Sequence, residues 1–367
     1  MPAAIRDAAS EIAWDRRSVR ALVEGLPKAE LHLHLDGSLS PRTVQRLARE
    51  QGYAPLKDKS LAELRASAVA RAPKDSLAEV LEVFKTIYPL LHRAEALERV
   101  AFELAAEAGR QNIRYLEARF APCLNAGPEL RMHEAVEAVL AGLARGEERF
   151  GVGWGAILCL LRPPLASRSQ NEETVELAVR YKGRGVVAVD LAGDEAAAPL
   201  SDYRDLFERA KGAGLSATVH AGEVEGSRDL ETAVELGVDR LGHALRLPDS
   251  PELLERIAAL AVPVEVNLTS NLRTGGVSGY ARHPARDFFR RGIPIALSTD
   301  DPGIFDIDLN GEYLLLSREL GFTPADLIAV ALQGAEASFA PPARRRALRR
   351  RFEDDISLLL AALRRPG

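Results

Sequence analysis

Strand-like and helix-like hydrophobic patterns alternate along most of the chain. In AELHLHLD, side chains at every second position share a face, so Leu31, Leu33 and Leu35 oppose His32 and His34. From residue 113, short apolar runs alternate with segments of helical periodicity. The predicted strands are 31–35, 113–120, 153–161, 186–193, 215–222, 239–244, 262–268 and 293–300. Eight mostly apolar strands alternating with helices predict an α/β fold, a (β/α)8 TIM barrel.

Helical patterns flank and interrupt this predicted barrel. Residues 1–26 predict an N-terminal helix, and residues 310–364 predict C-terminal helices. Residues 41–108 lack a strand signal and predict a helical insertion after the first strand, which would act as a lid. No linker or internal repeat divides the sequence, so we expect a single domain over residues 1–367.

Composition and charge narrow the classes of partner. The 48 Lys and Arg residues against 53 Asp and Glu residues give a net charge of −5, which argues against a nucleic-acid partner. No apolar run approaches the ~18 residues of a membrane span, and the charged N-terminal segment lacks the apolar core of a signal peptide. The two cysteines cannot build a disulfide framework and suit a reducing compartment, so we expect a cytoplasmic protein. The sequence carries no signal for an oligomeric state.

Polar residues gather where the predicted strands end, which is where barrel enzymes place their chemistry. Four of the seven histidines are among them. As core residues, each would need its own buried partner, so their number favours a site. The set comprises His32, His34 and Asp36 after the first strand, Gly193, Asp194 and Glu195 after the fourth, His220 and Glu223 after the fifth, Gly242 and His243 after the sixth, and Asp300 and Asp301 after the eighth.

Part of this set suits a metal ion. His32 and His34 would aim two imidazoles the same way at a spacing of about 6.6 Å. His220 and Asp300 would complete a mononuclear site of nitrogen and oxygen ligands, which favours zinc or another borderline divalent metal. Such an ion makes a bound water acidic enough to supply hydroxide near neutral pH. The C-x-x-C signature of the nucleobase deaminases that bind zinc through cysteines and the H-E-x-x-H helix of metalloproteases are both absent from the sequence.

Seven segments then follow one another in a recognisable order. They are PKAELHLHLDGSLSP (27–41), VVAVDLAGDE (186–195), TVHAGE (218–223), RLGHA (240–244), TSNLRTGGV (269–277), HPARDFFRRGIPIALSTDDP (283–302) and Glu312-Tyr313. Together they strongly resemble the adenosine deaminase family of metal-dependent amidohydrolases, over roughly residues 27 to 340. The resemblance implies a TIM barrel that uses one zinc ion per chain to deaminate a purine nucleoside.

The resemblance also implies a role for each catalytic residue. Glu223 resembles the acid that gives a proton to purine N1, and a closed apolar pocket would raise its pKa enough for that role. His243 resembles the imidazole that orients the attacking hydroxide, and Asp300 with His243 would take the proton of the water. The residues that resemble the zinc ligands are His32, His34, His220 and Asp300.

Further residues resemble the family's substrate-binding groups. Asp301 would bind purine N7, the Gly193 N–H would meet N3, and Asp36 would bind the ribose hydroxyls. The apolar lid over the base would comprise Leu77, Val80, Leu81 and Phe84. Two positions depart from the family pattern. Ala244 stands where a Gly is common, and Asn267-Leu268 stands where Cys-Pro or Cys-Leu is common. Ala244 adds a methyl group that could reshape the pocket.

The expected reaction converts adenosine, or 2′-deoxyadenosine, to inosine and ammonia. The same chemistry on adenine or 6-aminodeoxyfutalosine is the nearest alternative. Asp36 favours a nucleoside, because a free base has no ribose for it to hold, although a carboxylate there could also cap the following turn. A binuclear amidohydrolase would need a carboxylated Lys after the fourth strand, where Asp190 to Gly193 offer none. A catalytically dead barrel kept for binding would tolerate the loss of a ligand, and none is lost.

Overall fold

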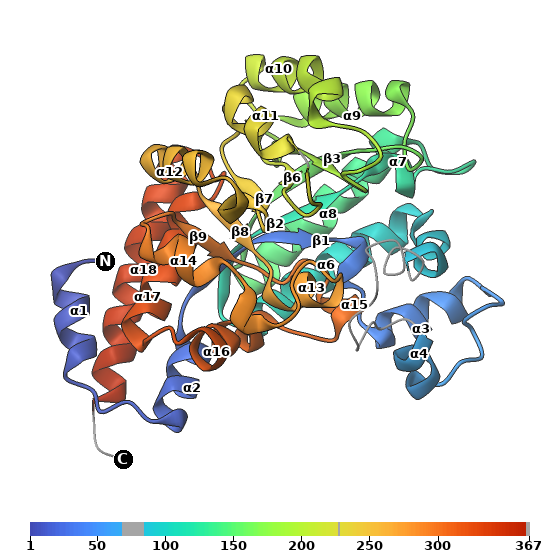
Figure 1. Ribbon diagram of the computed structural model, residues 1–367. Helices are drawn as coiled ribbons and strands as arrows, with labels where there is room; N and C mark the ends of the chain where they lie inside the picture. Colours follow the sequence, from blue (N-terminus) through green and yellow to red (C-terminus); the bar gives the residue numbers. More distant parts are fainter. Residues whose placement is uncertain (68–83, 227, 365–367) are drawn as a thin grey trace.

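Parallel strands surrounded by helices form the centre of the molecule (Figure 1). The structure is a computed structural model and describes residues 1–67, 84–226 and 228–364. One parallel sheet comprises β1 (Lys28–His34), β2 (Ile113–Phe120), β3 (Gly153–Leu161), β4 (Val186–Ala192) and β5 (Ser216–Ala217). The other comprises β6 (His220–Ala221), β7 (Leu241–His243), β8 (Val264–Val266) and β9 (Ile295–Leu297). Strand neighbours follow chain order in both sheets, as in a (β/α)8 barrel.

Backbone hydrogen bonds join the two sheets at both seams. β5 and β6 are the two halves of the predicted strand 215–222, and between them Thr218 N donates to the Val189 carbonyl at 3.1 Å. At the other seam, the chain beyond β9 pairs with β1, because His34 N donates to the Asp300 carbonyl (2.8 Å) and Asp300 N donates to the His32 carbonyl (2.9 Å). The predicted α/β barrel architecture is confirmed, with one strand interrupted.

Helices cover the outside of the strands with their apolar faces. α6, for example, buries Leu97, Val100 and Ala101, which recur at helical spacing. The helices between strands are α6 (Ala94–Arg110), α7 (Pro122–Asn125), α8 (Met132–Phe150), α9 (Arg168–Tyr181), α10 (Arg204–Gly212), α11 (Asp229–Leu236), α12 (Pro251–Leu260), α13 (Leu268–Arg273) and α14 (Ala285–Arg290). Short 3-10 turns are η3 (Leu200–Tyr203), η4 (Leu247–Asp249) and η5 (Tyr280–Arg282).

The N-terminal segment departs from the prediction of one helix over 1–26. It forms two helices, α1 (Ala3–Ser10) and α2 (Arg16–Gly25). The reason is an N-cap at Asp15, whose carboxylate accepts a hydrogen bond from Ser18 N at 2.7 Å and starts a new helix there. The C-terminal segment is helical as predicted, with α15 (Pro302–Phe305), α16 (Leu309–Leu320), α17 (Pro324–Ala337) and α18 (Pro342–Leu363). Among the described residues, no helix combines the length and apolar character needed to cross a membrane.

The insertion after β1 is helical where it is described. It contains η1 (Asp36–Ser38), α3 (Pro41–Glu50), α4 (Leu61–Ser67) and η2 (Tyr88–Leu91). Ser40 caps α3 by accepting from Thr43 N at 3.1 Å. Of the predicted lid residues, Phe84 is buried and stacks on Tyr88 with ring centroids 5.8 Å apart. The other three, Leu77, Val80 and Leu81, lie outside the described residues.

The barrel interior is unusually polar for a core. Three arginines are fully buried inside the molecule, and each forms an ion pair with a buried carboxylate. The pairs are Arg119 with Asp190 (2.8 Å), Arg162 with Asp229 (2.7 Å) and Arg240 with Glu117 (2.6 Å). Because an unpaired buried charge is costly, the pairs of Arg119 and Arg240 fix how β2 meets β4 and the start of β7, and the pair of Arg162 joins the end of β3 to α11.

Candidate active site

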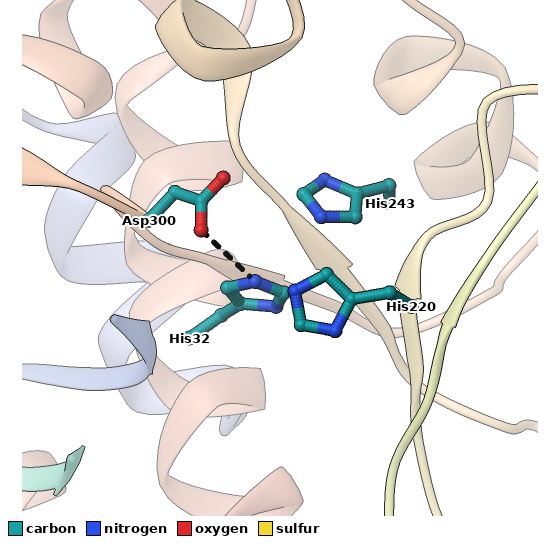
Figure 2. Close-up of side chains that lie close together, drawn as sticks. All are labelled: His32, His220, His243 and Asp300. Atoms are coloured by element: carbon teal, nitrogen blue, oxygen red, sulfur yellow. Dashed lines mark ion pairs between the residues drawn. The ribbon is translucent and has the colours of Figure 1, made fainter. Parts of the chain in front are cut away.

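Four side chains from four different strands converge at the C-terminal end of the barrel. His32, His220, His243 and Asp300 each bring one possible ligand atom to within 4.8 Å of the others, and all four are buried. Figure 2 shows the Asp300 carboxylate directed at the His32 ring, with the rings of His220 and His243 beside it. The strand-end residues that the sequence singled out are therefore brought together.

His34 reaches the same cluster from the end of β1. Its Nε2 atom lies 3.2 Å from His220 Nε2 and 3.4 Å from Asp300 Oδ1. The predicted ligand set of His32, His34, His220 and Asp300 therefore shares one small volume. His243 lies in that volume too, with its ring centroid 4.8 Å from that of His32.

Two buried carboxylates orient the imidazoles. His32 Nδ1 lies 2.5 Å from Glu265 Oε2, and His220 Nδ1 lies 3.0 Å from Asp190 Oδ2. Both rings therefore direct Nε2 into the cluster. His32 Nε2 is buried and lies 3.2 Å from Asp300 Oδ1, and His220 Nε2 lies 3.2 Å from His34 Nε2. Carboxylate-oriented imidazoles whose inner nitrogens converge with a carboxylate oxygen on one small volume fit a borderline divalent cation.

Sequence reasoning gave Glu265 and Asp190 no role in orienting the ligands. Their signal was one carboxylate inside each of two apolar strands, VPVEVNL and VVAVDLAG. A charged side chain that is buried on a central strand needs a partner of opposite charge or a hydrogen-bond donor. A carboxylate inside an apolar strand is therefore a signal that could have identified both residues.

The protonation states of the cluster suit cation binding. Burial lowers the pKa of His34 to about 3, and burial also lowers the pKa values of His220 and His243. Burial opposes ionisation of Asp300, but His32 and the other imidazoles hold its pKa well below the ordinary value. His32 is the exception, because Asp300 and Glu265 overcome its burial and raise its pKa. Metal ligands must be deprotonated, so cation binding would displace that proton.

Glu223 faces the cluster from the loop after β6. Its Oε1 atom lies 3.7 Å from His243 Nε2. Burial, together with the nearby charges of Glu195 and Asp300, raises the pKa of Glu223 to about 8. The side chain therefore carries a proton at neutral pH, which is the state that a general acid needs.

Glu195 holds the loop that carries Glu223. Its carboxylate accepts three backbone N–H bonds, from Gly222 (2.9 Å), Glu223 (2.9 Å) and Val224 (3.2 Å). The sequence placed Glu195 at the end of the fourth strand without a role, because only the fold brings that strand end beside the next loop.

Two further buried carboxylates, Asp36 and Asp301, lie near Asp300 of the cluster. Burial raises the pKa of Asp36 to about 6, and the Tyr88 hydroxyl hydrogen-bonds to this carboxylate. Burial and the neighbouring Asp300 and Asp36 charges raise the pKa of Asp301 well above the ordinary value. Each has a buried Oδ1 atom with no hydrogen-bond partner among the described residues. Gly37 packs against Asp301 so closely that a Cβ on Gly37 would lie 1.8 Å from Asp301 Oδ1.

The backbone around the cluster adopts left-handed conformations. His243, Ala244 and Asp300 have φ angles of 61°, 51° and 67°, which L-residues seldom adopt. Gly193, with φ 94°, needs its lack of a side chain. Ala244 is fully buried, so its methyl group fills space beside the site, as the sequence suggested.

Comparisons with known proteins agree with this geometry. The family model described as adenosine deaminase matches residues 27–355. The chain is 36% identical to an adenosine deaminase of Mycobacterium sp. (strain KMS), covering 88% of this chain and 92% of that protein. The structure resembles an N6-mAMP deaminase of Arabidopsis (TM-score 0.81, 29% identity, 90% and 99% coverage). It also resembles an amidohydrolase of Burkholderia ambifaria with bound Zn (TM-score 0.84, 27% identity, 96% of each chain). The chain belongs to the adenosine deaminase family and is a hydrolytic deaminase.

Proposed function

We propose that the chain deaminates adenosine and 2′-deoxyadenosine, giving inosine or 2′-deoxyinosine and ammonia. One observation carries this proposal. The protonated Glu223 carboxyl lies beside His243, next to the imidazole and carboxylate cluster, so an acid and a nucleophile site face the same small volume. The 36% identity to a curated adenosine deaminase over most of the chain supports the choice of substrate.

We assign one Zn²⁺ ion to His32, His34, His220 and Asp300. The convergence of the His32 and His34 Nε2 atoms on Asp300 Oδ1 and the lack of thiolates in this set support the ion, as does the zinc bound by the Burkholderia ambifaria relative. When bound, such an ion supplies a water acidic enough to attack near neutral pH. β4 ends without a Lys, which supports one ion rather than two.

The carboxyl groups of the chain would hold and activate the purine. Neutral Asp301 can donate a hydrogen bond to N7, and Glu223 can donate its proton to N1 as the water oxygen bonds to C6. Asp300 would take the first proton of the water, which His243 beside it helps to orient, and would pass that proton to the departing amino nitrogen. The second water proton returns to Glu223 when the C6–N bond has broken and ammonia has left.

The remaining contacts would select the substrate. Asp36, whose carboxylate is hydrogen-bonded by Tyr88, would accept from the ribose hydroxyls, and the Gly193 N–H would meet N3. Phe84 would cover the base, with the segment 41–108 acting as a lid on the single barrel domain 1–367 and the helical segments 1–26 and 310–364 supporting it. Both cysteines are free, which supports a cytoplasmic location.

The test is a substrate panel with zinc-loaded protein. Loss of absorbance near the adenosine maximum is followed for adenosine, 2′-deoxyadenosine, adenine and 6-aminodeoxyfutalosine, with Asp300→Ala as the inactive control. We expect the highest kcat/KM for adenosine and about one zinc per chain. A higher kcat/KM for adenine or 6-aminodeoxyfutalosine than for adenosine overturns the proposed substrate. No turnover of any 6-aminopurine overturns the proposed function, and about two ions per chain overturns the mononuclear site.

A further inference from the structure

The outer nitrogen of the His243 ring faces two buried amides rather than a carboxylate. Asn271 Nδ2 lies 2.9 Å from His243 Nδ1, and the side-chain amide of Asn267 lies 3.2 Å from the same atom. Both asparagines are fully buried. The arrangement differs from His32 and His220, whose Nδ1 atoms face Glu265 and Asp190.

The orientation of Asn271 can be traced to a backbone N–H. Ala285 N donates to His283 Nδ1 at 3.1 Å, so a neutral His283 carries its proton on Nε2. Burial lowers the pKa of His283 to about 3, so the ring is neutral. His283 Nε2 lies 3.0 Å from Asn271 Oδ1 and donates to it. The Asn271 amide nitrogen must then face His243.

This chain of bonds decides where His243 carries its proton. Asn271 Nδ2–H donates to His243 Nδ1, so Nδ1 has to be unprotonated. The proton of the neutral ring then sits on Nε2, the atom 3.7 Å from Glu223 Oε1. A ring in this tautomer donates a hydrogen bond into the site and has no lone pair there with which to accept a proton.

Asn267 favours the other tautomer of His243, with the proton on Nδ1. Its Nδ2 donates to the carbonyl oxygens of Val266 (3.2 Å) and Ser298 (3.3 Å) when its Oδ1 faces His243 Nδ1 at 3.2 Å. That oxygen would accept from Nδ1–H of the other tautomer. The shorter contact is the one to Asn271, which favours the proton on Nε2.

We propose that Asn271 and His283 are positioning residues that fix neutral His243 as an Nε2–H donor toward the attacking water. Asp300 is then the group that accepts the proton of the water, and Asn267 is the neighbour that opposes this tautomer. The catalytic meaning of the tautomer rests on the proposed deamination, whereas the tautomer itself does not.

Nitrogen NMR of the full-length, zinc-loaded protein tests the tautomer without substrate. The protein is labelled with ¹⁵N-histidine, and the His243 signals are assigned by their loss in His243→Gln. We expect Nε2–H with unprotonated Nδ1 in the unmodified protein. In Asn271→Asp, the carboxylate needs a donor, so the proton should move to Nδ1. Asn267→Leu removes the opposing acceptor and should keep the proton on Nε2.

Either of two NMR results overturns the proposal: Nδ1–H in the unmodified protein, or an unchanged tautomer in Asn271→Asp. The first needs no variant to fold. For adenosine, Asn271→Asp should lower kcat on the order of a hundredfold with KM little changed. An unchanged kcat despite a moved proton also overturns the positioning role. If the NMR results hold but no 6-aminopurine is turned over, the proposed function fails and the tautomer assignment stands.

Discussion

His32 Nδ1 lies 2.5 Å from Glu265 Oε2, with both side chains fully buried. Glu265 also accepts from Arg119 Nη2 at 2.9 Å and from Arg240 Nε at 2.6 Å. Burial opposes its ionisation, but the two guanidinium groups hold the pKa of Glu265 well below the ordinary value. The carboxylate is therefore charged at neutral pH, and it orients His32 with Nε2 toward the cluster.

Glu265→Gln should weaken zinc binding about 10- to 100-fold, because the amide orients His32 less firmly and lowers its basicity. Competition with a chromophoric chelator measures the affinity, and activity should return with excess zinc. Glu252→Gln, on the exposed first turn of α12, is the matched control and should bind like the unmodified protein. Zinc affinity unchanged by Glu265→Gln would contradict the orienting role.

The rate should fall on the alkaline side of neutrality. The pKa of Glu223 is raised to about 8 by burial, so the carboxyl is protonated below that pH and loses its proton as the pH rises through it. A bound divalent cation favours the carboxylate, so the alkaline limb of kcat should lie at or below pH 8. Glu223→Gln should lower kcat by about 10²–10⁴-fold, remove the limb and leave zinc content unchanged. If Glu223→Gln had the same pH–rate profile as the unmodified enzyme, Glu223 would not be the general acid.

Glu195→Gln should move that limb to lower pH. Removing a like charge near Glu223 favours the carboxylate, so the pKa of Glu223 falls. The amide can still accept with one oxygen from the N–H groups of residues 222–224, which limits damage to the loop. Asp194→Asn changes an exposed neighbouring charge and serves as the control in the same pH–rate measurement. A limb that moves equally in both variants would point to a general charge effect instead.

Gly37→Ala should damage purine binding. A Cβ on Gly37 would lie 1.8 Å from Asp301 Oδ1, so the carboxyl that we assign to N7 must move. We expect kcat/KM for adenosine to fall at least about tenfold, since a hydrogen bond to a substrate ring atom is misplaced. Gly212→Ala, where a Cβ would meet nothing within 4 Å, should retain full activity. Equal kcat/KM values for the two variants would show that Asp301 does not need its present position.

Local periodicity made the barrel predictable, because buried parallel strands and amphipathic helices each leave a pattern within a few residues. The interruption of the fifth strand at Thr218 was not predictable, since its apolar run is continuous and the break depends on neighbouring strands. The split of the N-terminal helix had a signal, the Asp15-x-x-Ser18 cap, which the longer periodicity concealed.

The site divides in the same way. His32 and His34 can be recognised in the sequence because they alternate with leucines on one strand. Asp300 and His220 can be recognised because they lie at the ends of predicted strands. Glu265, Asp190 and Asn271 act through other side chains, so their roles appear only when the strands are set in register. His283 lies outside the strand ends, and only the packing of η5, which it follows, beside α13 links it through Asn271 to His243.

Arg119 couples the affinity of the site for an ion to the stability of the barrel interior. Its guanidinium bonds to Asp190 at 2.8 Å and to Glu265 at 2.9 Å, the two carboxylates that orient His220 and His32. A disturbance at either histidine is therefore passed to the other through one buried cation. Substitutions of Asp190 and Glu265 should be non-additive in a double-mutant cycle. Release of the proposed zinc ion and unfolding of the barrel interior should then be linked equilibria, so the unfolding temperature should rise with the free zinc concentration.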